Sequence, residues 1–162
     1  MKNNYKTGFF KVLYEQKGYS QEWIEKRLRG IAVRQELTNE WEQREVHNKD
    51  YGILTNEIAK ATFGKTVEQY KKYKQIKKEN LRDHMADLKL IFTMLGEKVT
   101  TEITKKENAK GFFQCKSASQ RGGRIAGNAR RETEKEIGSS VATSENFLAE
   151  SESQKRLKLK KQ

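Results

Sequence analysis

The chain has 162 residues, a net charge of +12 and a single cysteine. The lone cysteine excludes an internal disulfide and favours a reducing compartment. No apolar run reaches the length of about 18 residues that a membrane-spanning helix needs. The N-terminal lysines are not followed by the apolar segment of a signal peptide, so we expect a cytoplasmic protein.

Hydrophobic residues make up 34% of the chain and charged residues 35%, against roughly 25% charged residues in typical domains. We therefore expect a thin core spread over several helices. There is no proline, and because proline breaks helix interiors, its absence favours long helices. The predicted fold is all-α, an extended multi-helix bundle with a flexible polar and basic C-terminal tail. Its expected parts are a short N-terminal helix and lead-in over residues 1–19, a helical domain over 20–142, and a mobile Ser/Glu-rich segment with a basic tail over 143–162.

The first long helix is predicted to begin after Ser20, a residue type that caps helix N-termini well. Two apolar stripes follow, and the second is rotated far around the helix from the first. Gly30 lies near the change of phase, so either the helix bends there or it is contacted on two sides. Thr38 offers an alternative start for a separate helix. The stripes consist of Ile24, Leu28 and Ile31, then Val33, Leu37 and Trp41.

A short helix is predicted next, over residues 56–63. The polar stretch before it, residues 47–51, is typical of a loop, and Thr55 is the expected N-cap. Gly64 occupies the position that glycine favours just past a helix end.

The most informative segment is residues 65–82, which contain seven basic residues and two acidic ones. Thr66 and Gln69 have the capping-box spacing that starts a helix. Lysine and arginine neutralise phosphates and release counterions, so the segment is predicted to bind nucleic acid or an acidic protein; the alternative is an ordinary solvated helix face. A helix running through without a break would align four of these residues, at 71, 74, 78 and 82. The candidate binding residues are Lys65, Lys71, Lys72, Lys74, Lys77, Lys78 and Arg82.

Two tyrosines, Tyr70 and Tyr73, lie among these lysines. Stacking on unpaired bases would contribute about 1–3 kcal/mol for each ring. The alternative is that both rings pack inward against Leu81 and its neighbours.

The strongest helical pattern covers residues 80–96. It is apolar on two faces, as expected of a helix in the middle of a bundle, and Gly96 is predicted to end it. Val99 and Ile103 then mark a further helix as far as about Asn108. The main stripe consists of Leu81, Met85, Leu88, Phe92 and Leu95, and the second face carries Leu90 and Met94.

A helix with a stripe of mostly small residues is predicted between Gly111 and Gly138. Its adjacent glycines, Gly122 and Gly123, cost roughly 1 kcal/mol each in a helix relative to alanine, which indicates close backbone approach or a break. Arginine binds phosphate and carboxylate in a bidentate manner. This segment therefore predicts either a nucleic-acid or partner-docking surface, or two closely packed helices with arginines at the rim. The arginines are Arg121, Arg124, Arg130 and Arg131.

No reaction centre is visible in the sequence. The histidines, His47 and His84, and the cysteine, Cys115, lack the spacing of a zinc site. A cysteine nucleophile would need a nearby base, and none is indicated. We expect no catalytic residue, no metal and no cofactor.

An ordered series of segments carries a family resemblance: WIEKRLRGIAVRQELTNEW at 23–41, YGILTNEIAKATFG at 51–64, KENLRDHMADLKLIFTMLGE at 78–97, TTEITKK at 100–106 and Gly-Asn-Ala-Arg at 127–130. Together they resemble the C-terminal part of phage antirepressor-like proteins related to DNA-damage-inducible protein D, over roughly residues 20–150. Such proteins usually carry a Bro-N domain ahead of this region, and no Bro-N-like β-rich segment is found here.

The lack of a reaction centre predicts a non-enzymatic protein, and the resemblance implies a role in a prophage or DNA-damage (SOS-type) response. It would act antirepressor-like, through contacts with nucleic acid, with a regulatory protein such as a repressor or recombinase, or with both. From the basic segments we expect nucleic-acid binding to be non-specific. Two alternatives remain open: a purely protein-directed inhibitor that does not bind nucleic acid, and an inactive fragment of a longer Bro-N-containing antirepressor.

Overall fold

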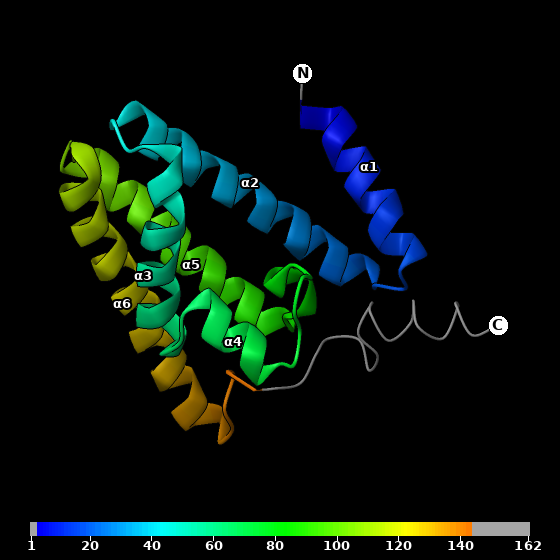
Figure 1. The fold of residues 1–162 in the computed structure, drawn as a ribbon. Coiled ribbons are helices and arrows are strands. Elements are labelled where there is room, and N and C mark those ends of the chain that lie inside the picture. The colour runs from blue at the N-terminus through cyan, green and yellow to red at the C-terminus, as the bar shows by residue number, and fades with distance from the viewer. Residues whose placement is uncertain (1–2, 144–162) are drawn as a thin grey trace.

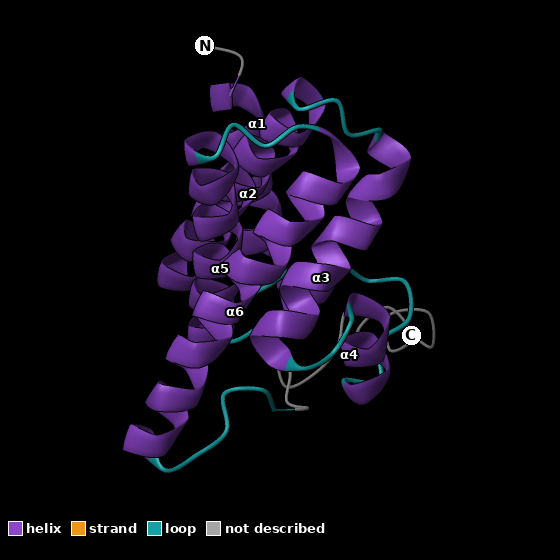
Figure 2. Ribbon diagram, turned by 90° about the vertical axis from the view of Figure 1, so that its left-hand side faces the viewer, coloured by secondary structure: helices purple, strands orange, loops and turns teal. Residues whose placement is uncertain are grey.

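The computed structural model describes residues 3–143, and within them it contains helices and no strand (Figures 1 and 2). The predicted all-α fold is confirmed. The predicted mobile segment and basic tail lie almost entirely outside the described residues. The α-helices are α1 (Asn3–Gln16), α2 (Gln21–Gln43), α3 (Tyr51–Phe63), α4 (Val67–Tyr73), α5 (Asp87–Lys106) and α6 (Gly111–Ile137), and two 3-10 helices are η1 (Asn48–Asp50) and η2 (Leu81–His84).

Helix α5 is the centre of the bundle. It packs against α2 on one side and α6 on the other, and α6 in turn packs against α3. The short α4 lies beside the end of α3, and α1 projects from the start of α2 (Figure 1). This arrangement places the basic stretch that follows α3 next to the body of the bundle.

Local capping signals in the sequence are realised at the helix ends. The Ser20 hydroxyl accepts a hydrogen bond from the Trp23 amide at 3.3 Å, which caps α2 as predicted. The predicted capping box of Thr66 and Gln69 is present at the start of α4. Gly64 ends α3 with φ at 75°, a conformation that glycine adopts without strain.

In the first half, one alternative helix start and one predicted boundary were wrong. Thr38 does not start a helix, because α2 is continuous and the Thr38 hydroxyl donates back to the Arg34 carbonyl at 3.3 Å. Helix α3 begins at Tyr51, so Thr55 lies within its first turns and donates to the Tyr51 carbonyl at 2.7 Å. A threonine hydroxyl inside a helix commonly donates a hydrogen bond to the carbonyl four residues earlier, and it then does not cap a helix N-terminus.

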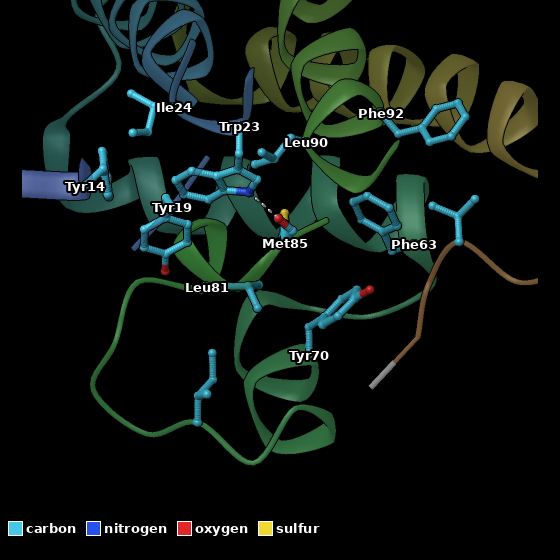
Figure 3. Close-up of a cluster of buried hydrophobic side chains, with 12 residues drawn as sticks. Tyr14, Tyr19, Trp23, Ile24, Phe63, Tyr70, Leu81, Met85, Leu90 and Phe92 are labelled. Atoms are coloured by element: carbon cyan, nitrogen blue, oxygen red, sulfur yellow. Dashed lines mark hydrogen bonds between the residues drawn. The ribbon is translucent and has the colours of Figure 1, made fainter. Parts of the chain in front are cut away.

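The predicted helix start at residue 80 was also wrong, because side chains from distant segments take the backbone carbonyls there. The Trp23 indole donates to the Met85 carbonyl at 2.8 Å (Figure 3), and the Tyr19 hydroxyl donates to the Asp83 carbonyl at 2.6 Å. Lys74 donates to the next carbonyl, that of His84, at 3.1 Å. Residues 81–84 consequently form η2, and α5 begins only at Asp87.

Gly96 lies inside α5 and does not end it, so Val99 and Ile103 belong to the same helix. A methyl group at Gly96 would lie 3.1 Å from both Ile58 and Thr62 of α3. The glycine therefore serves close packing between helices, which its sequence context did not reveal.

The glycines of α6 serve the same purpose, which confirms the packing alternative for them. A Cβ at Gly122 would lie 2.7 Å from the Thr100 amide nitrogen of α5, and one at Gly123 would lie 2.8 Å from the Ile58 carbonyl oxygen of α3. Helix α6 thus touches the backbones of both neighbours, and no larger residue fits at these contacts.

The buried apolar residues form two clusters along the bundle. One surrounds Trp23 and joins the start of α2 to α4 and α5 (Figure 3). The other surrounds Trp41 at the far end of α2. Between helices, buried threonines complete the core, and each satisfies its hydroxyl on the carbonyl four residues earlier, as Thr100 does on Gly96 at 2.7 Å.

Candidate anion-binding groove

A partly open cavity of 770 Å³ lies between α2 on one side and α3 and α4 on the other. Residues of α1 and of the segment before α5 close parts of its wall, and Thr93 and Glu97 of α5 line its floor. We call this cavity the groove. Its position follows from the packing described above, because α2 and α3 contact different sides of the central pair of helices, α5 and α6.

The groove is strongly cationic. Seven of its lining residues are basic and two are acidic. Four of the basic residues come from the segment 65–82 singled out in the sequence, two come from α2, and one follows the end of α1. The basic lining residues are Lys17, Arg27, Arg34, Lys65, Lys71, Lys78 and Arg82, and the acidic ones are Asp83 and Glu97.

At the floor, two arginines share one buried carboxylate. Glu97 is only 2% exposed; it accepts a hydrogen bond from Arg34 of α2 at 3.4 Å and forms an ion pair with Arg82 of η2. Arg34 also donates to the Thr55 hydroxyl at 2.6 Å. Burial lowers the pKa of Arg34, and the charge of Arg82 lowers it too, whereas Glu97 opposes both effects. One carboxylate therefore faces two guanidinium groups.

A second ion pair closes the wall near α1. Arg27 donates to the Asp83 carboxylate at 2.8 Å, and the Tyr14 hydroxyl donates to the same oxygen at 2.8 Å. Burial, together with the Asp83 charge, raises the pKa of Tyr14, so the phenol remains a donor at neutral pH. This pair is charge-balanced, and it fixes η2 against α1 and α2.

The groove lysines that come from the segment 65–82 are less well matched. Lys65 lies over the Tyr73 ring at 4.9 Å. Lys71 and Lys78 make no ion pair with any described residue. Lys72 and Lys77, which were also predicted as binding residues, are exposed and do not line the groove. The positive charge of the segment is therefore displayed partly in the groove and partly on the adjacent surface.

Two predicted site residues lie in the interior. Lys74 is 3% exposed and donates to the His84 carbonyl, since α4 ends at Tyr73 and the single stripe of four basic residues predicted for a continuous helix does not form. Tyr70 is 1% exposed and packs edge-on against Phe63 in the Trp23 cluster (Figure 3). The structure thus agrees with the inward-packing alternative for Tyr70. Tyr73 is 44% exposed and remains accessible.

The arginines of α6 have different local partners. Arg121 forms an ion pair with Glu107 at the end of α5, whereas Arg130 donates to the Thr62 carbonyl at 2.7 Å and pairs with Glu134. Arg131 bonds to Asn128, and Arg124 is exposed. Three of the four arginines therefore have local partners, and a nucleic-acid or partner-docking surface on α6 stays a prediction.

Sequence reasoning missed Arg34 and Glu97. Arg34 lies in an ordinary amphipathic stretch of α2, far along the chain from the basic segment. One signal was present for Glu97: it lies seven residues after the buried Leu90 and four before the buried Thr101, on the inner side of α5. A carboxylate on a buried helix face needs a cationic partner.

The described residues hold no group of three or more histidine, cysteine or acidic side chains arranged to bind a metal ion. Burial raises the pKa of the Cys115 thiol, which is the opposite of what a nucleophilic cysteine needs. None of the helices between residues 3 and 143 is long and apolar enough to cross a membrane.

Comparison of the chain with models of known protein families, with curated proteins and with solved structures returned no match.

Proposed function

We propose that this protein is a non-enzymatic binding protein whose partner is a polyanion, nucleic acid, held at the groove and on the exposed lysines beside it. In this proposal it acts in the cytoplasm as an antirepressor-like protein of a prophage or DNA-damage response. The observation that carries the proposal is the lining of the groove, where seven basic residues meet two acidic ones.

The charge excess supports a ligand and not merely stability. A buried or half-buried cation that serves the fold is normally matched by a carboxylate or a carbonyl, as Arg27 is by Asp83. The half-buried Lys71 has no such match among the described residues, and the exposed Lys78 lies on the same concave surface. Concentrated positive charge of this kind attracts phosphates and releases their counterions.

The proposal is tested by titrating single- and double-stranded DNA with the protein at several salt concentrations. We expect binding whose logarithmic affinity falls linearly with the logarithm of salt concentration. Binding that is absent at low salt, or that does not weaken with added salt, would contradict it.

A purely protein-directed inhibitor is the second candidate, and the projecting helix α1 favours it. Phe9 is 66% exposed and Val12 is 52% exposed, one helical turn apart. An apolar helix face of this kind can lie in a hydrophobic groove of a regulator. The two candidates are separated by capturing partners from a nuclease-treated lysate, with Phe9→Ser as the control variant: capture that survives nuclease and fails with the variant favours the protein-directed role.

A further inference from the structure

The floor of the groove holds more hydrogen-bond donors than the protein itself uses. A guanidinium group has five N–H donors in a fixed plane. The Arg82 guanidinium forms an ion pair with Glu97, and its other N–H groups have no partner among residues 3–143. Arg34 donates to Glu97 at 3.4 Å and to the Thr55 hydroxyl at 2.6 Å, and it lies over the Trp41 ring. Two half-buried guanidinium groups from different elements therefore converge on one carboxylate, and both line the groove.

The size of the groove limits what can reach this floor. At 770 Å³ it falls within the range of small-molecule pockets, about 300–1,000 Å³. A mononucleotide or the end of a single strand fits into such a volume, whereas a duplex is too wide to enter. Lys65, Lys71 and Lys78 line the walls, where a strand leaving the floor would pass.

We infer that Arg34 and Arg82 form a binding site for a phosphate monoester, carried either by a small molecule of mononucleotide size or by the end of a single nucleic-acid strand. The inference rests on the proposed function and names the part of the ligand that enters the groove. A monoester carries nearly two negative charges and three terminal oxygens, and arginine pairs with such a group through two parallel hydrogen bonds. A phosphodiester inside a strand has one charge and two free oxygens, so it matches the floor less well.

The test compares one labelled single-stranded oligonucleotide in three forms: 5′-phosphorylated, 3′-phosphorylated and with hydroxyl groups at both ends. Binding is followed by fluorescence anisotropy at fixed salt. We expect one of the phosphorylated ends to improve the affinity of the unmodified protein at least about tenfold, as charge-assisted hydrogen bonds of roughly 1.5–3 kcal/mol require. A nucleoside monophosphate, followed by calorimetry, is the arm that detects a small-molecule ligand.

Arg82→Gln is expected to remove the preference for a phosphorylated end. Because this variant leaves Glu97 with a single partner, Arg82→Lys is measured beside it: the lysine keeps the charge next to Glu97 but cannot form the bidentate contact, so the preference should fall while the protein stays folded by circular dichroism. Arg124→Gln is the matched control, since Arg124 is an exposed arginine outside the groove, and it should retain the preference.

The outcomes separate this inference from the proposed function. Equal affinity for all three oligonucleotide forms, with no binding of the monophosphate, overturns the phosphate site; if that binding is salt-dependent, the proposed function survives. Binding of the monophosphate without any binding of strands supports the site and overturns nucleic acid as the partner. No binding in any arm overturns both.

Discussion

Trp23 and Met85 are joined by a buried hydrogen bond, from the indole Nε1 to the backbone carbonyl at 2.8 Å. The bond holds Met85, an extended residue two positions before α5, against the start of α2 (Figure 3). It also explains why an apolar pattern of helical period does not become α-helix at residues 80–86. In this segment tertiary contacts outweigh local preference, and the groove depends on that outcome because η2 carries Arg82.

Replacing Trp23 with phenylalanine is expected to cost about 2–4 kcal/mol of unfolding free energy. The change leaves the Met85 carbonyl without its donor, at about 1–3 kcal/mol, and opens a cavity. Urea unfolding monitored by circular dichroism measures the loss. Trp41→Phe is the control, because Trp41 is equally buried but its Nε1 has no hydrogen-bond partner in the described chain. A loss as large in the control as in Trp23→Phe would contradict the role given to the bond.

Gly122→Ala is expected to destabilise the fold by about 2 kcal/mol or more, because the added methyl group overlaps the Thr100 backbone. Gly52→Ala is the matched control: Gly52 is also helical, in α3, and a methyl group there meets nothing within 4 Å. The control should gain about 0.5–1 kcal/mol from helix propensity. Thermal unfolding of both variants checks the prediction, and a neutral Gly122→Ala would refute the close contact of α5 and α6.

Cys115 is expected to react slowly with a thiol reagent in the folded protein. Its side chain is fully buried, and burial raises the pKa of the thiol, so little reactive thiolate exists near pH 8. Following the reaction with Ellman's reagent, with and without denaturing urea, measures this. Rapid labelling of the native protein would contradict the packing of α6.

Stability should fall as the pH is lowered below about 5, in part through Glu36. Hydrogen bonds from Lys98 and Lys105 hold the pKa of this carboxyl below its usual value. Its contribution is therefore complete above the unfolded-state pKa, about 4.3, and is lost as the pH falls through the folded-state pKa. Urea unfolding at several pH values should show a shallower acid loss for Glu36→Gln than for the unmodified protein. Glu136→Gln, at an exposed position that forms no ion pair with a described residue, should not differ from the unmodified protein.

Local signals predicted local features well. Ser20, Gly64 and the pair Thr66–Gln69 act through their own or adjacent backbone groups, so their roles could be recognised from neighbouring sequence. Gly96 misled the prediction, because the reason for that glycine lies in α3 and not in its own helix.

The candidate site was predicted only in part, for the same reason. Lys65, Lys71, Lys78 and Arg82 are close in sequence, and their common charge was visible there. However, α4 ends at Tyr73, so Lys74 is buried and does not share a surface with these four residues. Arg34 meets Arg82 only because α2, η2 and α5 converge on Glu97, and no local pattern encodes a meeting of three elements.

The most direct test of the central claim is the salt dependence of single-stranded DNA binding in two variants with equal loss of charge. In Lys71→Gln/Lys78→Gln the lost lysines line the groove, whereas in Lys106→Gln/Lys135→Gln they lie outside it. The groove variant should lose affinity, and its salt slope should fall by roughly one for each lysine removed, while the second variant should match the unmodified protein. Equal losses of affinity in both variants would show that DNA binding depends only on the net charge of the protein, and the groove would not be the binding site.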